Sequence, residues 1–334
     1  MVQHTCSTLI RRLGAAGFKR NFVNVAILPD WWDPSSEADT RLVADVELRI
    51  ARFLGAPLST VRDPRAPLAA PTYEGAQLRR VKDIGRDRLA PAIHAALSIA
   101  RAVVRNATLA TPVPPPVDGL VYRQELRRAK LVVRLDDILA DAWNRGIPII
   151  HVESLPSPSF QGLACIVEDR PVVLICHNLD EPGRLAFIIA HEIAHIVNGD
   201  CAPNRPVVDE EEEIVDDADI EKRADEYATL LLTGGAPIHA VDALGFKDLA
   251  QKAIASEKAQ AVDASSVIWA WARRTGDYAK ATMAAQALYR TRGGKRAIRA
   301  HLDRHIDLEN ASDSDRALLR CLHGDPERDA AAAL

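Results

Sequence analysis

The chain has 334 residues, of which 48% are hydrophobic, and a formal net charge of −4, which indicates a globular protein large enough for several modules. The sequence has no apolar run near the roughly 18 residues of a membrane-spanning helix, and residues 1–14 lack the apolar core of an export signal. Its five cysteines are scattered, which suits a reducing compartment better than a disulfide framework. We therefore expect a cytoplasmic protein that does not associate with membranes.

Residues 1–110 are predicted to form a helical module, with helices at residues 7–16, 19–28, 40–54 and 76–106, the last interrupted near Pro91. This part is mildly basic, with 16 Lys and Arg against 10 Asp and Glu. Residues 50–61 resemble the closing helices of a helix-turn-helix domain, but no complete recognition helix precedes them, so any such domain would be degenerate. A basic cluster consists of Arg79, Arg80, Lys82, Arg86 and Arg88. It either contacts nucleic-acid phosphates or forms a solvated helix face.

The proline cluster at residues 111–117 predicts a stiff, extended linker. After it, residues 122–144 have the periodicity of one amphipathic helix. The side chains predicted to face inward on that helix are Leu126, Leu131, Leu135, Ile138, Leu139 and Trp143. Three β-rich runs follow at residues 147–152, 162–167 and 172–176, and they predict a small three-stranded sheet.

The most informative segment is the HExxH pattern from His191 to His195, inside a helix predicted over residues 180–199. Residues four apart lie on one face of a helix, so His191 and His195 can bind one metal ion. Glu192 is then placed to activate a zinc-bound water as the catalytic base. The alternative is a pair of hydrogen-bonded core histidines with an incidental glutamate between them.

A zinc site needs a third protein ligand, and Glu221 on a helix predicted over residues 221–232 is the candidate. Asp225, one turn later, is placed to accept a hydrogen bond from the outer nitrogen of a ligand histidine. The alternative for Glu221 is an ordinary acidic helix start. Cys201, six residues past His195, is a candidate inhibitory fourth ligand, although an ordinary loop cysteine is the simpler interpretation.

Residues 241–334 are predicted to form a helical C-terminal module that contains no catalytic motif. In this half of the chain, helices are expected at residues 237–244, 247–258, 265–275, 278–289, 295–308 and 313–322. Such a module is suited to shaping substrate access or gating activity.

The order of HEIAH and, about two dozen residues later, E-x-x-A-D-x-Y-A-x-x-L-L resembles the ImmA/IrrE metallopeptidases. The resemblance covers roughly residues 120–240 and includes the strand that ends in His177-Asn178 upstream of the HExxH helix. It implies a gluzincin-like zinc protease, with His191, His195 and Glu221 as ligands and Glu192 as base. Members of the family act on helix-turn-helix repressors and so release stress, DNA-damage or mobile-element genes. Tyr227 stands where the family usually has Phe.

The sequence as a whole predicts a mostly helical α+β fold, with a zincin-like metallopeptidase domain at residues 118–240 between the N- and C-terminal helical modules. We expect a zinc-dependent endopeptidase whose protein substrate is a DNA-binding repressor. The alternative function is a non-proteolytic regulator or sensor that binds DNA or a protein partner on the same scaffold. The sequence does not single out the residue that stabilises the developing negative charge on the substrate; His177, Tyr227 and His239 are the candidates.

Overall fold

The computed structural model describes residues 5–29, 32–33, 39–73, 77–79, 86–128, 131–157, 159–176, 178–203, 206–209, 218–235, 243–288 and 292–322. The predicted helix over residues 237–244 lies almost entirely outside these ranges, and so do Arg80 and Lys82 of the basic cluster. In the described part, helices predominate and one small sheet is present, so the coarse α+β prediction is confirmed.

The first four helices are α1 (Cys6–Ala15), α2 (Arg20–Ala26), α3 (Thr40–Leu54) and α4 (Leu58–Arg62). Helix α3 has the predicted bounds because both ends carry caps: the Asp39 side chain accepts from the Arg41 backbone N–H, and Gly55 adopts the left-handed conformation (φ 61°). The guanidinium of Arg12 donates to four backbone carbonyls around α4, which fixes that short helix against α1.

The long helix predicted over residues 76–106 is wrong in its first part. Residues Gln77–Arg79 form strand β1, and helix α5 spans Arg86–Asn106. Pro91 lies inside α5 and does not end it, contrary to the predicted interruption. A proline in the second turn removes one amide donor from the helix, and the burial of α5 from Ala92 to Ala100 compensates for that loss.

The single helix predicted over residues 122–144 is two helices, α6 (Gly119–Arg127) and α7 (Leu135–Asn144). The Asp137 carboxylate accepts from the Arg134 backbone N–H at 3.0 Å, which marks the start of a new helix there. Leu131, predicted to face inward, lies between the two helices and is 72% exposed. Apolar spacing alone does not reveal such a break.

The sheet has five strands in the order β1-β5-β3-β4-β2, not the three that were predicted. The predicted strands are β2 (Ile149–His151), β3 (Gly162–Val167) and β4 (Arg170–Ile175), and β5 is Val207–Asp209. Strands β3 and β4 form a hairpin through Glu168 and Asp169, both with positive φ, as in a two-residue type I′ turn. The two missed strands are three residues long; β1 forms by pairing with β5, and β5 also pairs with β3.

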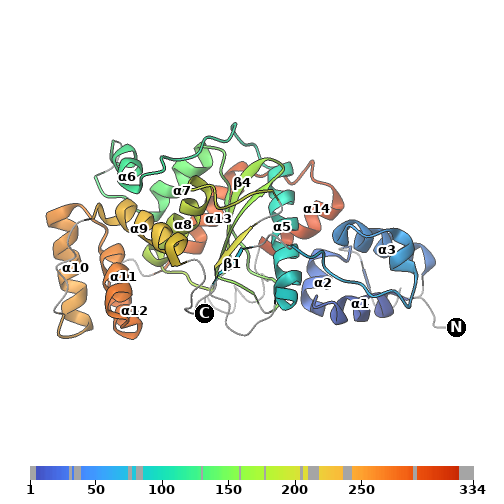
Figure 1. The fold of residues 1–334 in the computed structure, drawn as a ribbon. Coiled ribbons are helices and arrows are strands. Elements are labelled where there is room, and N and C mark those ends of the chain that lie inside the picture. The colour runs from blue at the N-terminus through green and yellow to red at the C-terminus, as the bar shows by residue number, and fades with distance from the viewer. Residues whose placement is uncertain are drawn as a thin grey trace.

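Helices pack on both faces of the sheet (Figure 1). Leu163, Cys165 and Leu174 face α5 and share a core with the N-terminal helices. Val173 and Ile175 face the opposite side, where their core includes α6, α7, α8 (Pro182–Val197) and α9 (Ala218–Thr233). The period-two alternation of strands therefore divides the hydrophobic interior into two layers.

The C-terminal part begins with a three-helix unit that has its own core, made of α10 (Phe246–Gln260), α11 (Ala264–Thr275) and α12 (Tyr278–Ala287). The chain then returns to the main body with α13 (Gly294–His305), α14 (Asp313–Leu319) and the 3-10 turn Arg320–Leu322. Helix α13 packs on α7 and β2, and α14 packs on α5 and α2. The residues predicted as one C-terminal module thus contribute to all three hydrophobic cores.

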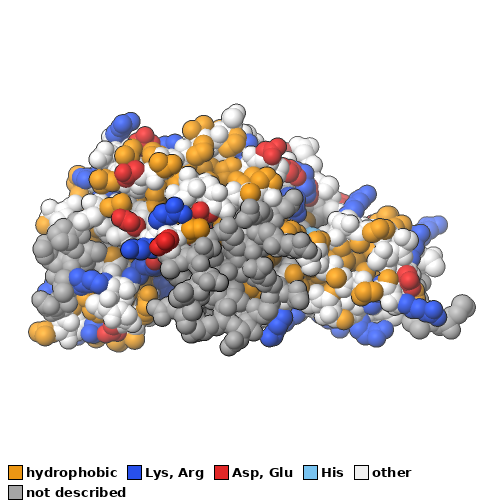
Figure 2. Space-filling model, viewed as in Figure 1, with side chains coloured by type: hydrophobic (Ala, Val, Ile, Leu, Met, Phe, Trp, Pro, Cys, Tyr) orange, Lys and Arg blue, Asp and Glu red, His pale blue; other side chains and the backbone are white. Residues whose placement is uncertain are grey.

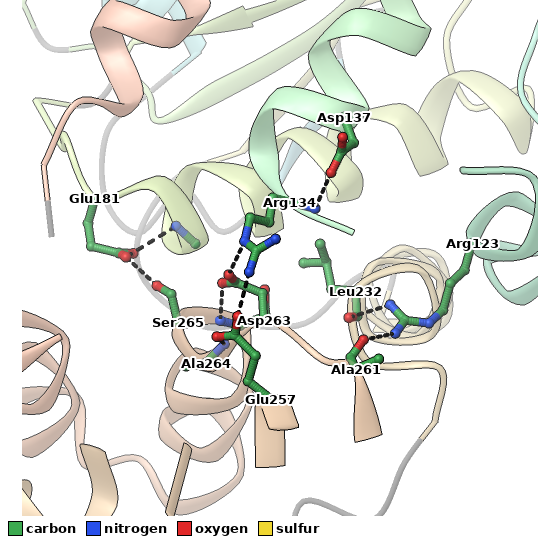
Figure 3. A network of polar contacts seen from close by, with 12 residues as sticks. Arg123, Arg134, Asp137, Glu181, Leu232, Glu257, Ala261, Asp263, Ala264 and Ser265 are labelled. Atoms are coloured by element: carbon green, nitrogen blue, oxygen red, sulfur yellow. Dashed lines mark hydrogen bonds and ion pairs between the residues drawn. The ribbon is translucent and has the colours of Figure 1, made fainter. Parts of the chain in front are cut away.

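Polar contacts join the three-helix unit to the helices beside it (Figure 3). Arg123 of α6 is 3% exposed and donates to the carbonyls of Leu231, Leu232 and Ala261 at 2.7–3.0 Å. Arg134 pairs with Glu257, and Glu181 accepts from the hydroxyl of Ser265 and the indole of Trp269. The unit is therefore anchored to the start of α8, the helix that carries HExxH.

Among the helices that the structure describes, none is long and apolar enough to cross a membrane. In the view of Figure 2, Lys and Arg side chains lie around the outer side of helices α1–α3, at the right-hand end of the molecule.

Candidate metal centre

Helix α8 carries three residues of the predicted site. Its N-cap, Glu181, accepts from the backbone N–H groups of Gly183 and Arg184, and Pro182 occupies the first turn. The helix packs against β3, β4, α7 and α9, so His191 is 2% exposed and Glu192 and His195 have no exposed surface. Burial on all sides fixes the orientation of these side chains.

Helix α9 packs along α8 and brings Glu221 to the two histidines. The Nε2 atoms of His191 and His195 lie 3.1 Å apart. The Glu221 carboxylate oxygens lie 3.2 Å from His191 Nε2 and 3.6 Å from His195 Nε2. Glu221 is 9% exposed, so these three groups form a buried cluster with one atom from each residue within 4.8 Å of the others.

These separations fit the donor set of a four-coordinate metal ion. Zinc binds imidazole nitrogens and carboxylate oxygens at about 2.0–2.1 Å, so two ligand atoms of a tetrahedral site lie roughly 3.3 Å apart. The three observed separations of 3.1, 3.2 and 3.6 Å bracket that value. The buried group could therefore bind a metal ion without rearrangement of its side chains.

Each histidine has a carboxylate on its outer nitrogen. Asp225 of α9 lies 2.9 Å from His191 Nδ1, and Asp200 lies 2.9 Å from His195 Nδ1. A carboxylate acceptor places the imidazole proton on Nδ1, which leaves the Nε2 lone pair directed at the cluster. Burial also lowers the pKa of His195, which favours the neutral form that can bind a metal ion.

The spacing of Glu221 and Asp225 predicted the contact of Asp225 with a histidine, but no sequence pattern singled out Asp200. The structural reason for its position is the end of α8: Gly199 adopts a left-handed conformation (φ 75°), and the Asp200 backbone N–H donates to the His195 carbonyl at 2.9 Å. This turn directs the Asp200 side chain back to the histidine. The Asn198-Gly199 stop signal could have indicated this geometry.

Arg273 is a further residue that sequence reasoning missed. Its guanidinium, from α11, forms an ion pair with Asp225 and lies 4.2 Å from the centre of the Phe187 ring. Arg273 thus links the three-helix unit to His191 through Asp225. The contact joins segments 48 residues apart, and no local pattern could identify it.

Glu192 lies over the first residue of β3. A Cβ atom built on Gly162 would be 2.1 Å from Glu192 Oε1 and 2.9 Å from Cδ, far inside van der Waals contact. The absence of a side chain at Gly162 therefore provides the space for the Glu192 carboxylate. The carboxylate is held between α8 and the sheet, one residue along the helix from His191.

The remaining candidates do not join this cluster. Cys201 lies outside the three-residue donor group, and burial raises the pKa of its thiol well above the ordinary value, which disfavours the thiolate needed for metal binding. Tyr227 donates its hydroxyl to the Pro116 carbonyl at 3.0 Å, so that group is engaged by the proline segment. His177 and His239 lie outside the described residues.

No family model matches this chain, and no curated protein is significantly similar to it.

Proposed function

We propose that the protein is a zinc-dependent endopeptidase with His191, His195 and Glu221 as metal ligands and Glu192 as general base. The observation that carries the proposal is the buried cluster of two imidazole Nε2 atoms and the Glu221 carboxylate. The Glu192 carboxylate lies on α8, one residue after His191. Two histidines and a glutamate are a donor set that leaves one coordination position open in catalytic zinc sites. The resemblance to the ImmA/IrrE metallopeptidases supports the same assignment.

A zinc ion at this position would polarise a peptide carbonyl and increase the acidity of a water molecule. The chain's own residues perform the other steps. Glu192 accepts the proton of the attacking water and transfers it to the leaving amine. Asp225 and Asp200 hold the Nδ1 protons of the two histidines, so that both rings keep their orientation while charge develops nearby.

A helix-turn-helix repressor is the substrate that we propose, on the ground of the family resemblance. The residues after the N-terminal module carry more Asp and Glu than Lys and Arg, and the whole chain has a formal net charge of −4. This negative charge would attract a basic DNA-binding protein.

The test uses metal-loaded wild-type protein and Glu192→Gln, incubated with a peptide library and with the helix-turn-helix repressors of the same genome, followed by mass spectrometry. Glu192→Gln keeps the shape of the side chain and the metal ligands, so it should bind zinc and cleave nothing. New fragments with the wild type alone would support the proposal. Equal zinc content without cleavage by either protein would favour the non-proteolytic regulator.

A further inference from the structure

A second site lies away from the metal cluster, in the N-terminal half of the molecule. A cavity of about 1000 Å³ opens between the end of α3, the segment at Pro71–Tyr73, helix α5 and the start of α14. None of its lining residues belongs to the metal cluster. Helix α5 packs on the face of β3 and β4 opposite to α8, so the sheet separates the cavity from the metal centre (Figure 1).

The walls of this cavity are strongly cationic. Among the residues that the structure describes, four arginines and a single carboxylate, that of Asp315, line it. Two of the arginines are neutralised: Arg49 by Asp45 at 2.8 Å, and Arg105 by Asp315. For Arg52 and Arg101, the part of the chain that the structure describes provides no carboxylate within ion-pair distance. These two guanidinium groups, from α3 and α5, leave an excess of positive charge in the cavity.

One wall of the cavity is aromatic and uncharged. His94 is 4% exposed, with Nε2 at 2.5 Å from the Phe53 carbonyl and Nδ1 at 2.7 Å from the Tyr73 hydroxyl. Burial lowers the pKa of His94 to about 4, so the ring is neutral at physiological pH. The Phe53 and His94 rings pack edge to face, with centroids 4.8 Å apart. This network fixes the three rings in place and gives the cavity a rigid surface against which a flat group can pack.

We propose that this cavity binds a phosphate-bearing small molecule of nucleotide size through Arg52 and Arg101. Guanidinium groups match phosphate oxygens with two parallel hydrogen bonds, and a phosphate would supply the negative charge that the two arginines lack. The volume is at the upper end of the range for small-molecule sites, which is enough for a nucleoside diphosphate. The base would pack on the aromatic wall of Phe53 and Tyr73. This site is independent of the proposed peptidase activity.

The test measures binding of the four ribonucleoside diphosphates to the full-length protein by isothermal titration calorimetry, without divalent metal in the buffer. Adenosine serves as the uncharged comparison. The matched variants are Arg52→Gln/Arg101→Gln and, as control, Arg20→Gln/Arg41→Gln, which removes the same charge from two exposed positions outside the cavity. Circular dichroism confirms that both variants fold.

We expect one-to-one binding of at least one nucleoside diphosphate and none of adenosine at the same concentration. The cavity variant should bind about 10- to 100-fold more weakly, and the control variant should bind like the wild type. Glu192→Gln should leave the affinity unchanged, which separates this result from the fate of the peptidase proposal. The absence of saturable binding by all four diphosphates would overturn the proposal, and so would equal losses in the two double variants. Tighter, equally site-dependent binding of a single-stranded oligonucleotide would replace it with a nucleic-acid site.

Discussion

The packing of Glu192 on Gly162 provides a test of the site's architecture that needs no substrate. In Gly162→Ala, the new Cβ would stand 2.1 Å from Oε1, 2.9 Å from Cδ and 3.2 Å from Cγ of Glu192. Carbon and oxygen atoms that are not bonded approach to about 3.4 Å at van der Waals contact. The carboxylate must therefore move by more than about 1 Å, and because Glu192 has no exposed surface it cannot turn into solvent.

Overpacking of this kind costs about 1–3 kcal/mol of folding free energy. The same displacement of a catalytic base by about 1 Å would lower the turnover of the proposed peptidase roughly 100-fold. The three atoms nearest to the added methyl group all belong to Glu192, so metal content should stay at the wild-type value.

Urea unfolding with and without Gly162→Ala in three backgrounds, the wild type, Glu192→Gln and Glu192→Ala, isolates the contact. Gly162→Ala should cost about 1–3 kcal/mol in the wild type and in Glu192→Gln, whose side chain has the same shape. In Glu192→Ala the three clashing atoms are gone, so most of that cost should vanish, which gives a coupling energy of at least about 1 kcal/mol. An equal cost of Gly162→Ala in the Gln and Ala backgrounds would refute the placement of Glu192 over β3.

Three further predictions concern the metal centre, the cavity and the buried contacts of Arg123. Asp200→Asn and Asp225→Asn should each weaken zinc binding about 10- to 100-fold in a chelator competition, because each removes the acceptor of a histidine Nδ1 proton; the exposed Asp219→Asn is the control, and affinities equal to the control would contradict the assignment. His94 has a folded-state pKa of about 4, below its ordinary 6.5, so as the pH falls the unfolded chain takes up the proton first. The free energy of unfolding should therefore decrease by about 3 kcal/mol between pH 6.5 and pH 4. His94→Gln should lose this pH dependence in unfolding measurements. Arg123→Gln should lower the free energy of unfolding by about 2–3 kcal/mol, because it leaves the carbonyls of Leu231, Leu232 and Ala261 without this donor. An unchanged urea midpoint would show that these bonds contribute nothing.

Elements with strong local signals could be predicted from the sequence. Helix α3 has an N-cap aspartate and a C-terminal glycine, and its predicted bounds are confirmed. The HExxH helix was predicted for the same reason: Pro182 and Asn198-Gly199 mark its ends. Helix α9 was predicted from its composition, within three residues at its start.

Elements that depend on distant partners could not be predicted. Strands β1 and β5 are three residues each and exist because β1 pairs with β5 and β5 pairs with β3. The break between α6 and α7 depends on the capping of Arg134 by Asp137, which an apolar periodicity does not register.

At the metal centre the same division holds. The residues within one helix turn of each other, His191, His195 and the Glu221–Asp225 pair, follow from i, i+4 spacing. Asp200 reaches His195 through a turn, and Arg273 reaches Asp225 through tertiary packing. Gly162 acts by lacking a side chain, and no local pattern marks such a residue.

The most direct test of the account is the metal content of the purified protein. Inductively coupled plasma mass spectrometry should find one zinc per chain in the wild type and in Glu192→Gln after dialysis against metal-free buffer, and much less than one in His191→Ala and Glu221→Ala. Stoichiometric zinc in the two ligand variants, or none in a wild-type protein reconstituted with zinc, would contradict the central claim that these residues form a metal centre.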